Sequence, residues 1–260
     1  VLQERMVYRE YYTGAPLVAL KTAFFTERED VTEKDLNKMK IILTASEINR
    51  AVRHVANIIN IKFKGKQPLL IGVLKGVYVF LADLCRYLHI DYTLNFIKAS
   101  SYSSQQQSNK VSVNSHSLEK VENKDERNVI IFDELEDHGK TIYTVKKNLV
   151  AMGFNEKKIS SCVLFKKDIS PDCKVEYPDS DIIGISDLPN VWLVGYGLDD
   201  QQSKRGWAHL FAVPKAKGIP KSKLDIIFDD TDKGKAAYEN QRKLVLNSLK
   251  DMETVSKIWK

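Results

Sequence analysis

Residues 128–141, Asn-Val-Ile-Ile-Phe-Asp-Glu-Leu-Glu-Asp-His-Gly-Lys-Thr, connect a predicted strand to a predicted helix through an acidic turn. The apolar run from Val129 to Ile131 is β-branched, as strands favour, and it leads to two adjacent carboxylates, Asp133 and Glu134. Apolar residues recur at helical spacing directly after the turn. The stretch therefore predicts a buried strand, an acidic turn and a helix N-terminus in direct succession.

This order of elements suits a phosphorylated sugar. The first backbone N–H groups of a helix have no partner within the helix, so together with the Thr141 hydroxyl they can bind a dianion. The carboxylates of Asp133 and Glu134 can bind the hydroxyls of a ribose or a hydrated Mg²⁺ ion. We therefore expect the turn from Asp137 to Thr141 to bind a phosphate, beside a sugar held by the carboxylates.

Strands and helices alternate along the middle of the chain, which predicts an α/β fold with a mostly parallel twisted sheet flanked by helices. In such sheets ligands bind at the carboxyl ends of the strands, where the acidic turn lies. Helices are expected after a cap at Thr44 or Ser46, from about Tyr78 to Leu88, and after the acidic turn. The expected strands are Leu69–Leu74, Tyr92–Ile97, Val129–Glu134, Ile159–Phe165, Asp181–Ile185 and Val191–Val194.

The flanking segments have a different character from the middle. We expect residues 1–41 to be an N-terminal extension, 42–213 the main domain, and 214–260 a linker followed by a C-terminal helix. The apolar stripe of that helix, over 234–258, is typical of a helix that packs on its own domain. Residues 100–118 are rich in serine and poor in apolar side chains, so we expect a mobile loop that is either a lid or a tolerated surface insertion.

Composition narrows the class of protein. A formal net charge of +6 is too small, without a concentrated basic stripe, to indicate nucleic-acid binding. The cysteines at 85, 162 and 173 are odd in number and lack metal-type spacing, which favours free thiols in a reducing compartment. No segment has the length of apolar sequence that a membrane span needs, and the N-terminus lacks the apolar core of a secretion signal. A cytoplasmic protein is expected.

The stretch 128–141 resembles the phosphoribosyl diphosphate (PRPP) motif of the type I phosphoribosyltransferases. Further segments resemble the hypoxanthine-guanine (6-oxopurine) members in particular, over about residues 42–213. The segments that carry this resemblance are Leu74-Lys75-Gly76, Ser101-Tyr102, Phe165-Lys166 and Val191–Asp199. The resemblance implies the type I fold, with a small hood, to which the extension 1–41 would contribute, and a mobile loop.

The resemblance also implies roles for individual residues. Asp133, Glu134, Asp137, His138, Gly139, Lys140 and Thr141 would bind the ribose and its 5′-phosphate, and Asp137 would also be the general base near the purine N7. Leu74, Lys75, Gly76, Ser101, Tyr102 and Arg205 would contact pyrophosphate. Lys166 would reach the 6-oxygen of the purine, Trp192 would stack on its ring, and Leu193 would offer backbone groups to its edge. Asp133, Glu134 and Asp199 would be Mg²⁺ ligands.

The sequence departs from the family pattern at two positions of the motif. The family usually has Glu then Asp where this chain has Asp133 and Glu134, which keeps the charge but changes the reach of each side chain. His138 replaces a small hydroxyl residue that is common at that point. These are the positions where we expect altered kinetics.

The reaction implied is transfer of the 5-phosphoribosyl group from PRPP to N9 of hypoxanthine or guanine, with Mg²⁺, giving IMP or GMP and pyrophosphate in purine salvage. A homodimer or homotetramer is also implied. Three alternatives stay open from the sequence: a broader or xanthine-preferring enzyme, a non-catalytic PRPP- or nucleotide-sensing regulator, and an additional scaffolding role for the C-terminal helix.

Overall fold

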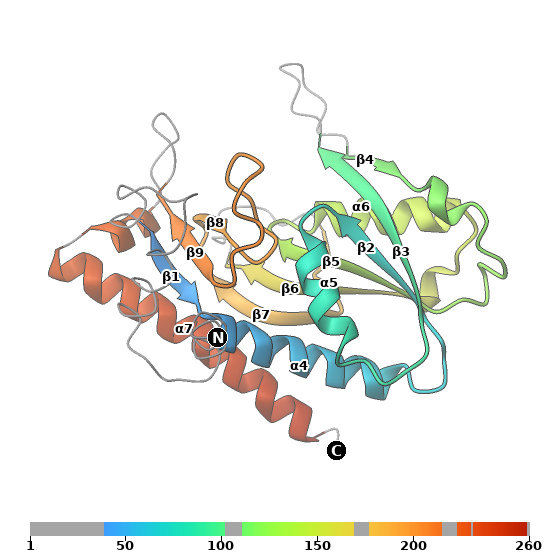
Figure 1. The fold of residues 1–260 in the computed structure, drawn as a ribbon, viewed down its shortest axis with the longest axis horizontal. Coiled ribbons are helices and arrows are strands. Elements are labelled where there is room, and N and C mark those ends of the chain that lie inside the picture. The colour runs from blue at the N-terminus through green and yellow to red at the C-terminus, as the bar shows by residue number, and fades with distance from the viewer. Residues whose placement is uncertain (1–38, 102–110, 169–176, 215–222, 230, 259–260) are drawn as a thin grey trace, which may run out of the picture.

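A six-stranded, mostly parallel sheet forms the centre of the computed structural model, which describes residues 39–101, 111–168, 177–214, 223–229 and 231–258 (Figure 1). The strand order is β4-β3-β2-β5-β6-β7, and all neighbours are parallel except the pair of β3 and β4. The strands are β2 (Leu69–Leu74), β3 (Thr93–Ser101), β4 (Val111–Asn114), β5 (Val129–Glu136), β6 (Ile159–Lys167) and β7 (Ile182–Leu188).

Helices cover both faces of this sheet, which confirms the predicted fold class. Alternate residues of one strand face opposite sides, so Leu70 packs in the apolar cluster that includes α4, α5 and α7, while Ile71 packs in the cluster that includes α6. The helices are α4 (Ala45–Lys62), α5 (Val77–Cys85), α6 (Lys140–Ala151) and α7 (Asp232–Ile258), with short 3₁₀ helices η1 (His116–Leu118), η2 (Glu156–Lys158) and η3 (Lys223–Phe228).

Helix α4 begins as the sequence predicts. Thr44 is its N-cap, and the Thr44 hydroxyl accepts a hydrogen bond from the Glu47 N–H while the Glu47 carboxylate accepts one from the Thr44 N–H. This reciprocal capping box satisfies two backbone donors that the first turn would otherwise leave without partners.

A second, antiparallel sheet lies beside the first and forms the hood. Its order is β1-β9-β8, with β1 (Lys40–Leu43), β8 (Trp192–Val194) and β9 (Leu210–Val213). The fully buried rings of Trp207 and Phe211 pack edge to face in its core. Strand β9 was not predicted, because a four-residue apolar strand in a loop-rich segment carries too little periodicity to recognise.

Two segments differ from the expectations drawn from composition. Residues 111–118 of the predicted loop form β4 and η1, because β4 pairs antiparallel with the end of β3 and so gains ladder hydrogen bonds that composition does not reveal. Residues 102–110 lie outside the described residues. In the predicted linker, residues 223–228 form η3.

The C-terminal helix packs on its own chain, as its stripe predicted. Val245 and Leu249 of α7 are buried in the same apolar cluster as α4, and α7 contacts β7, α4 and β1. Figure 1 shows α7 running beneath β1 and across α4. Among the described residues, no helix has the combination of length and apolarity that crossing a membrane requires.

Candidate functional site

The carboxyl end of β5 and the turn after β2 meet at the centre of the sheet. β2 and β5 are parallel neighbours, so their carboxyl ends lie at the same edge. The Leu74–Lys75 peptide bond in the turn is cis. A Cβ atom on Gly76 would overlap the carboxylate of Glu134, so a larger residue there would displace this side chain. The structure thus brings two predicted site segments into direct contact.

Asp133 and Glu134 form an acidic pair with little access to water. Asp133 is buried, and this burial, together with the neighbouring Glu134 carboxylate, raises its pKa well above the usual range. Burial also raises the pKa of Glu134, while the charge of Arg205 opposes the rise. Glu134 Oε2 is buried and has no hydrogen-bond partner among the described residues. An acidic pair of this kind is suited to a cation or to hydroxyl donors from a ligand.

The loop after β8 reaches the same place. Asp199 and Arg205 form an ion pair of 2.6 Å between Oδ1 and Nη2, and the Arg205 Nη1 donates to the Gly197 carbonyl at 2.8 Å. The ammonium of Lys75 donates to Gln202 Oε1 at 2.9 Å, which links this loop to the turn after β2. Predicted pyrophosphate and metal residues that are far apart in the sequence are therefore adjacent.

A cavity of about 580 Å³ opens at the start of α6 and is lined by all five residues of Asp137–Thr141. Asp133, Glu136 and Tyr177 line it as well. Gly139, the residue at the N-cap of α6, has φ = +73°, which glycine adopts without strain, and it has no side chain to cap the helix. Backbone N–H groups at the start of α6 are therefore suited to an anion in the cavity.

Charged side chains of β5 and β6 continue the site beyond the cavity. The Lys167 ammonium donates to Asp137 Oδ2 at 3.2 Å, and Lys166 pairs with Asp179 and, at 3.9 Å, with Glu136. Glu136 is buried and accepts hydrogen bonds from the backbone N–H and hydroxyl of Ser180. Lys166 is thus placed between two carboxylates.

Trp192 and Leu193 differ in exposure. Trp192 opens strand β8 and is 51% exposed, as a ring that stacks on an incoming base must be, whereas Leu193 is buried. No described contact joins Trp192 to the residues of β5. The stacking role of Trp192 stays a prediction.

Two predicted residues are not placed. Tyr102 lies outside the described residues, and for Ser101 only the backbone is described, where it ends β3 opposite Val111. Glu136, Lys167, Tyr177 and Gln202 belong to the site but were not predicted. The signal for Glu136 was available, since it is one strand period beyond Glu134.

The acidic residues fit Mg²⁺ only in company with a ligand. Among the described residues, no group of three His, Cys, Asp or Glu side chains is arranged to hold a metal ion. Mg²⁺ commonly takes one or two carboxylates and completes its shell with waters and substrate phosphates. The buried Glu134 Oε2 beside Asp133 is suited to that use, whereas Asp199 is engaged by Arg205 and by the Gln202 N–H.

Known proteins are similar to this chain in fold and in part of the sequence. A hypoxanthine phosphoribosyltransferase from Buchnera aphidicola subsp. Schizaphis graminum is 34% identical over 173 residues, covering 64% of this chain and 91% of that protein. The crystal structure of a hypoxanthine-guanine phosphoribosyltransferase from Bacillus anthracis has 28% identity and a TM-score of 0.57, and covers 66% of this chain and 96% of its own. A hypoxanthine phosphoribosyltransferase from Trypanosoma cruzi, in complex with the product IMP, has 26% identity and a TM-score of 0.56, and covers 67% of this chain and 93% of its own.

The sequence model of the phosphoribosyl transferase domain matches residues 39–201, which include β1, the acidic turn, β8 and the start of the loop that carries Arg205. With the acidic pair, the anion cavity and the relatives in agreement, the chain belongs to the phosphoribosyl transferase family, among its hypoxanthine and hypoxanthine-guanine members.

Proposed function

We propose that this enzyme transfers the 5-phosphoribosyl group of PRPP to N9 of hypoxanthine or guanine, forming IMP or GMP and pyrophosphate. The observation that most supports the proposal is the meeting of Glu134, Gly76 and the Asp199–Arg205 pair beside the anion cavity of α6. A ribose with a phosphate at C5 and a diphosphate at C1 needs anion sites on either side of an acidic pair.

The cavity at α6 receives the 5′-phosphate, and the acidic pair receives the ribose. Backbone N–H groups and the side chains of Lys140 and Thr141 surround the phosphate, and His138 lies on the cavity wall. Asp133 and Glu134 accept hydrogen bonds from the ribose hydroxyls. Glu134 Oε2 is available for this, because it accepts no hydrogen bond from the described residues.

The turn after β2 and the loop after β8 bind the pyrophosphate. Arg205 supplies a charge-assisted contact, and the Leu74–Gly76 backbone supplies N–H groups. Asp133, Glu134 and Asp199 would hold Mg²⁺, which when bound neutralises the leaving pyrophosphate. Ser101 and Tyr102 are assigned to the same ligand by resemblance alone.

Asp137 takes the proton from the purine as N9 attacks the anomeric carbon. Its carboxylate is 47% exposed and therefore accessible to a base, and the Lys167 ammonium holds it in position. Lys166 donates to the 6-oxygen, which favours an oxo over an amino group because an amino group would present a second donor. Trp192 stacks on the ring and Leu193 offers backbone groups to its edge.

A steady-state assay with PRPP, Mg²⁺ and each of hypoxanthine, guanine, xanthine and adenine tests this proposal. Turnover with hypoxanthine or guanine, and none with adenine, is expected. Xanthine as the best substrate would move the assignment to the broader 6-oxopurine alternative. Failure to turn over any oxopurine would contradict the proposal and favour the non-catalytic PRPP- or nucleotide-sensing regulator.

A homodimer or homotetramer and a cytoplasmic location remain predictions. Mass in solution, measured for the full chain and for a chain without residues 234–260, tests the first and also tests a scaffolding role for the last helix. An unchanged oligomer in the shortened chain would remove that role.

A further inference from the structure

Helix α7 lies beyond the residues that match the family, yet it buries polar side chains. Gln241, Arg242 and Ser248 are each less than 10% exposed. Burying such groups is costly unless each finds a hydrogen-bond partner, so their partners indicate what the helix holds. All three bond to residues of the two sheets or of the α4 N-terminus.

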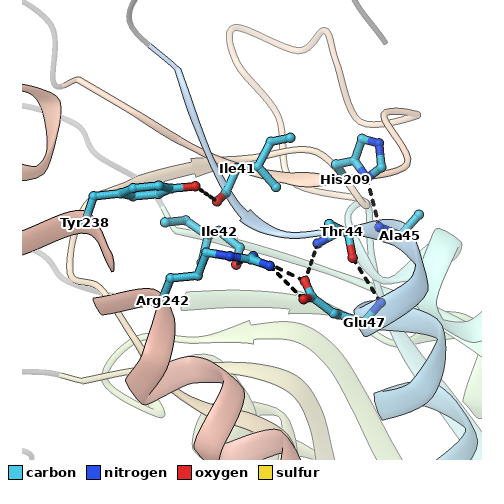
Figure 2. Close-up of polar contacts among 8 residues, drawn as sticks. All are labelled: Ile41, Ile42, Thr44, Ala45, Glu47, His209, Tyr238 and Arg242. Carbon is cyan, nitrogen blue, oxygen red and sulfur yellow. Dashed lines mark hydrogen bonds and ion pairs between the residues drawn. The ribbon is translucent and has the colours of Figure 1, made fainter. Parts of the chain in front are cut away.

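The first set of partners lies at an irregularity in the hood. The register of β1 with β9 shifts between Ile41 and Leu43. At this shift the Tyr238 hydroxyl donates to the Ile41 carbonyl at 2.7 Å, and Arg242 Nη1 donates to the Ile42 carbonyl at 2.8 Å (Figure 2). Burial raises the pKa of Tyr238 to about 12, so its phenol keeps the proton it donates.

The second set lies at a bulge in β7, the edge strand of the central sheet. Phe165 pairs with Ile185 and Lys167 pairs with Leu188, so Ser186 and Asp187 together oppose the single residue Lys166. Here the Ser186 N–H donates to Ser248 Oγ at 2.9 Å. The Asp187 carbonyl accepts from Gln241 Nε2 at 2.9 Å, and Asp187 itself has φ = +61°.

Arg242 joins the hood site to the start of α4. Its guanidinium contacts both carboxylate oxygens of Glu47, at 2.7 and 3.3 Å, and Glu47 is the capping-box residue of Thr44. The His209 ring, just before β9, accepts from the Ala45 N–H at 2.8 Å in the same cluster (Figure 2). One helix therefore holds irregular points of both sheets at a fixed separation.

The register shift in β1 and the bulge in β7 are each connected through strand pairing to residues assigned to the purine. The bulge in β7 lies opposite Lys166, and the irregular point in β1 is joined through β9 to β8, which carries Trp192 and Leu193. The turn after β2 and the α6 cavity are built on other strands, so of the phosphate-binding segments only the loop that carries Asp199 and Arg205 is attached to the hood. We propose that α7 is a positioning element for the purine half of the site, with Tyr238 and Arg242 holding the hood and Gln241 and Ser248 holding the β7 bulge.

The kinetic test of this inference uses conservative variants and rests on the proposed function. Tyr238→Phe removes one hydrogen bond at β1, and Ser248→Ala removes the bonds with the backbone N–H and the hydroxyl of Ser186 at β7. We expect each variant to raise KM for hypoxanthine about three- to tenfold, as the loss of one net hydrogen bond would, and to raise KM for PRPP less, because only the loop with Asp199 and Arg205 joins the PRPP site to the hood. Arg242→Met should have a larger effect and Arg242→Lys an intermediate one. Lys243→Met, which replaces the exposed neighbour of Arg242, is the matched control and should change neither KM.

Amide hydrogen exchange gives a readout that does not depend on turnover. In Tyr238→Phe, amides of β8 and β9 should exchange faster, while those of β2 and β5 keep the wild-type rate. Equal rises in both KM values, or faster exchange throughout both sheets, would mean that α7 only supports the fold. If the wild type turns over no oxopurine, the proposed function fails, whereas the exchange pattern still decides the role of α7.

Discussion

At the residue scale, the chemistry of this enzyme depends on a few charged side chains whose surroundings differ sharply. Asp133 is buried beside another carboxylate, whereas Asp137, four residues on, is half exposed and paired with Lys167. His209 is fully buried, and burial lowers its pKa from 6.5 to about 4. Residues of the same type therefore differ in their effect on activity and stability, and single substitutions distinguish these effects.

We predict that Asp137→Asn lowers kcat by about a hundredfold or more, because the amide cannot accept the purine proton. Binding of PRPP should weaken much less, since the backbone of the turn is retained. Single-turnover rates and PRPP affinity measured by calorimetry check this. The control is Asp91→Asn, an exposed carboxylate before β3 at the opposite edge of the sheet. A loss confined to PRPP binding would show that Asp137 is not the base.

We predict that His209 makes the protein less stable as the pH falls from 6.5 towards 4. In this window the unfolded chain binds a proton at the imidazole and the folded chain does not. The free energy of unfolding is therefore highest above pH 6.5 and declines below it. Each pKa unit is worth about 1.4 kcal/mol, so the decline amounts to about 3 kcal/mol. Urea titrations of wild type and His209→Asn at several pH values measure it.

The asparagine variant keeps an acceptor for the Ala45 N–H but does not titrate, so its stability should depend less on pH over this range. His116→Asn removes a histidine that is exposed and paired with Glu119, and should keep the wild-type slope. Parallel curves for wild type and His209→Asn would contradict the assignment.

At the element scale, the site is assembled by loops that cross from one sheet to the other. The loop after β8 touches the turn after β2, where a Cβ atom on Gly197 would overlap the Gly76 carbonyl, and the Tyr196 hydroxyl donates to Asp83 of α5 at 2.7 Å. Gly197 has φ = +99°, which side chains rarely adopt. The approach of the two loops thus depends on a residue without a side chain.

Gly197→Ala should lower the free energy of unfolding by about 1–3 kcal/mol, through backbone strain and the overlap with Gly76. It should also raise KM for PRPP, because Arg205 bonds the Gly197 carbonyl and would move with it. Gly206→Ala is the control, since a Cβ atom there meets nothing within 4 Å. Denaturant titration and steady-state kinetics of both variants check this; equal behaviour of the two would contradict it.

At the scale of the whole molecule, the ligand site spans the boundary between two sheets that share one apolar cluster. Leu210 of the hood and Leu70 of the central sheet belong to this cluster together with Val245 of α7. The acidic pair at its edge is a local cost to the free protein, because two neighbouring carboxylates with raised pKa values stand in little water. A bound ligand that satisfies the pair should therefore stabilise the entire fold.

We predict that PRPP with Mg²⁺, at a hundred times the dissociation constant, stabilises the protein by about 2.7 kcal/mol. For a chain of this size that raises the melting temperature by roughly 5–10 °C. Asp133→Asn should melt at a higher temperature than the wild type without ligand, because one of two adjacent buried acidic groups is gone, and should gain less from PRPP and Mg²⁺. Differential scanning calorimetry measures both effects. A ligand-free Asp133→Asn protein that melts lower than the wild type would contradict this account.

The sequence by itself determined the parallel strands of the central sheet, its main helices and the acidic turn, but not the antiparallel strand β4. Continuous apolar runs such as Leu69–Leu74 specify buried strands, and the Thr44 cap specifies the start of α4, because these signals are local in the chain. The motif 128–141 also identified the family. The predicted ends of strands were less accurate. β5 was predicted to end at Glu134, and it extends to Glu136.

Only the tertiary structure decided which distant groups meet. The Lys167–Asp137 pair, the contact of Gly76 with Glu134 and the bonds from α7 to the bulges of β1 and β7 join residues from separate elements. No local pattern encodes them, because they depend on strand register and on the crossing of loops between sheets. The acidic turn specifies a ribose-phosphate site through its own residue order, whereas the surroundings that would select a purine come from packing.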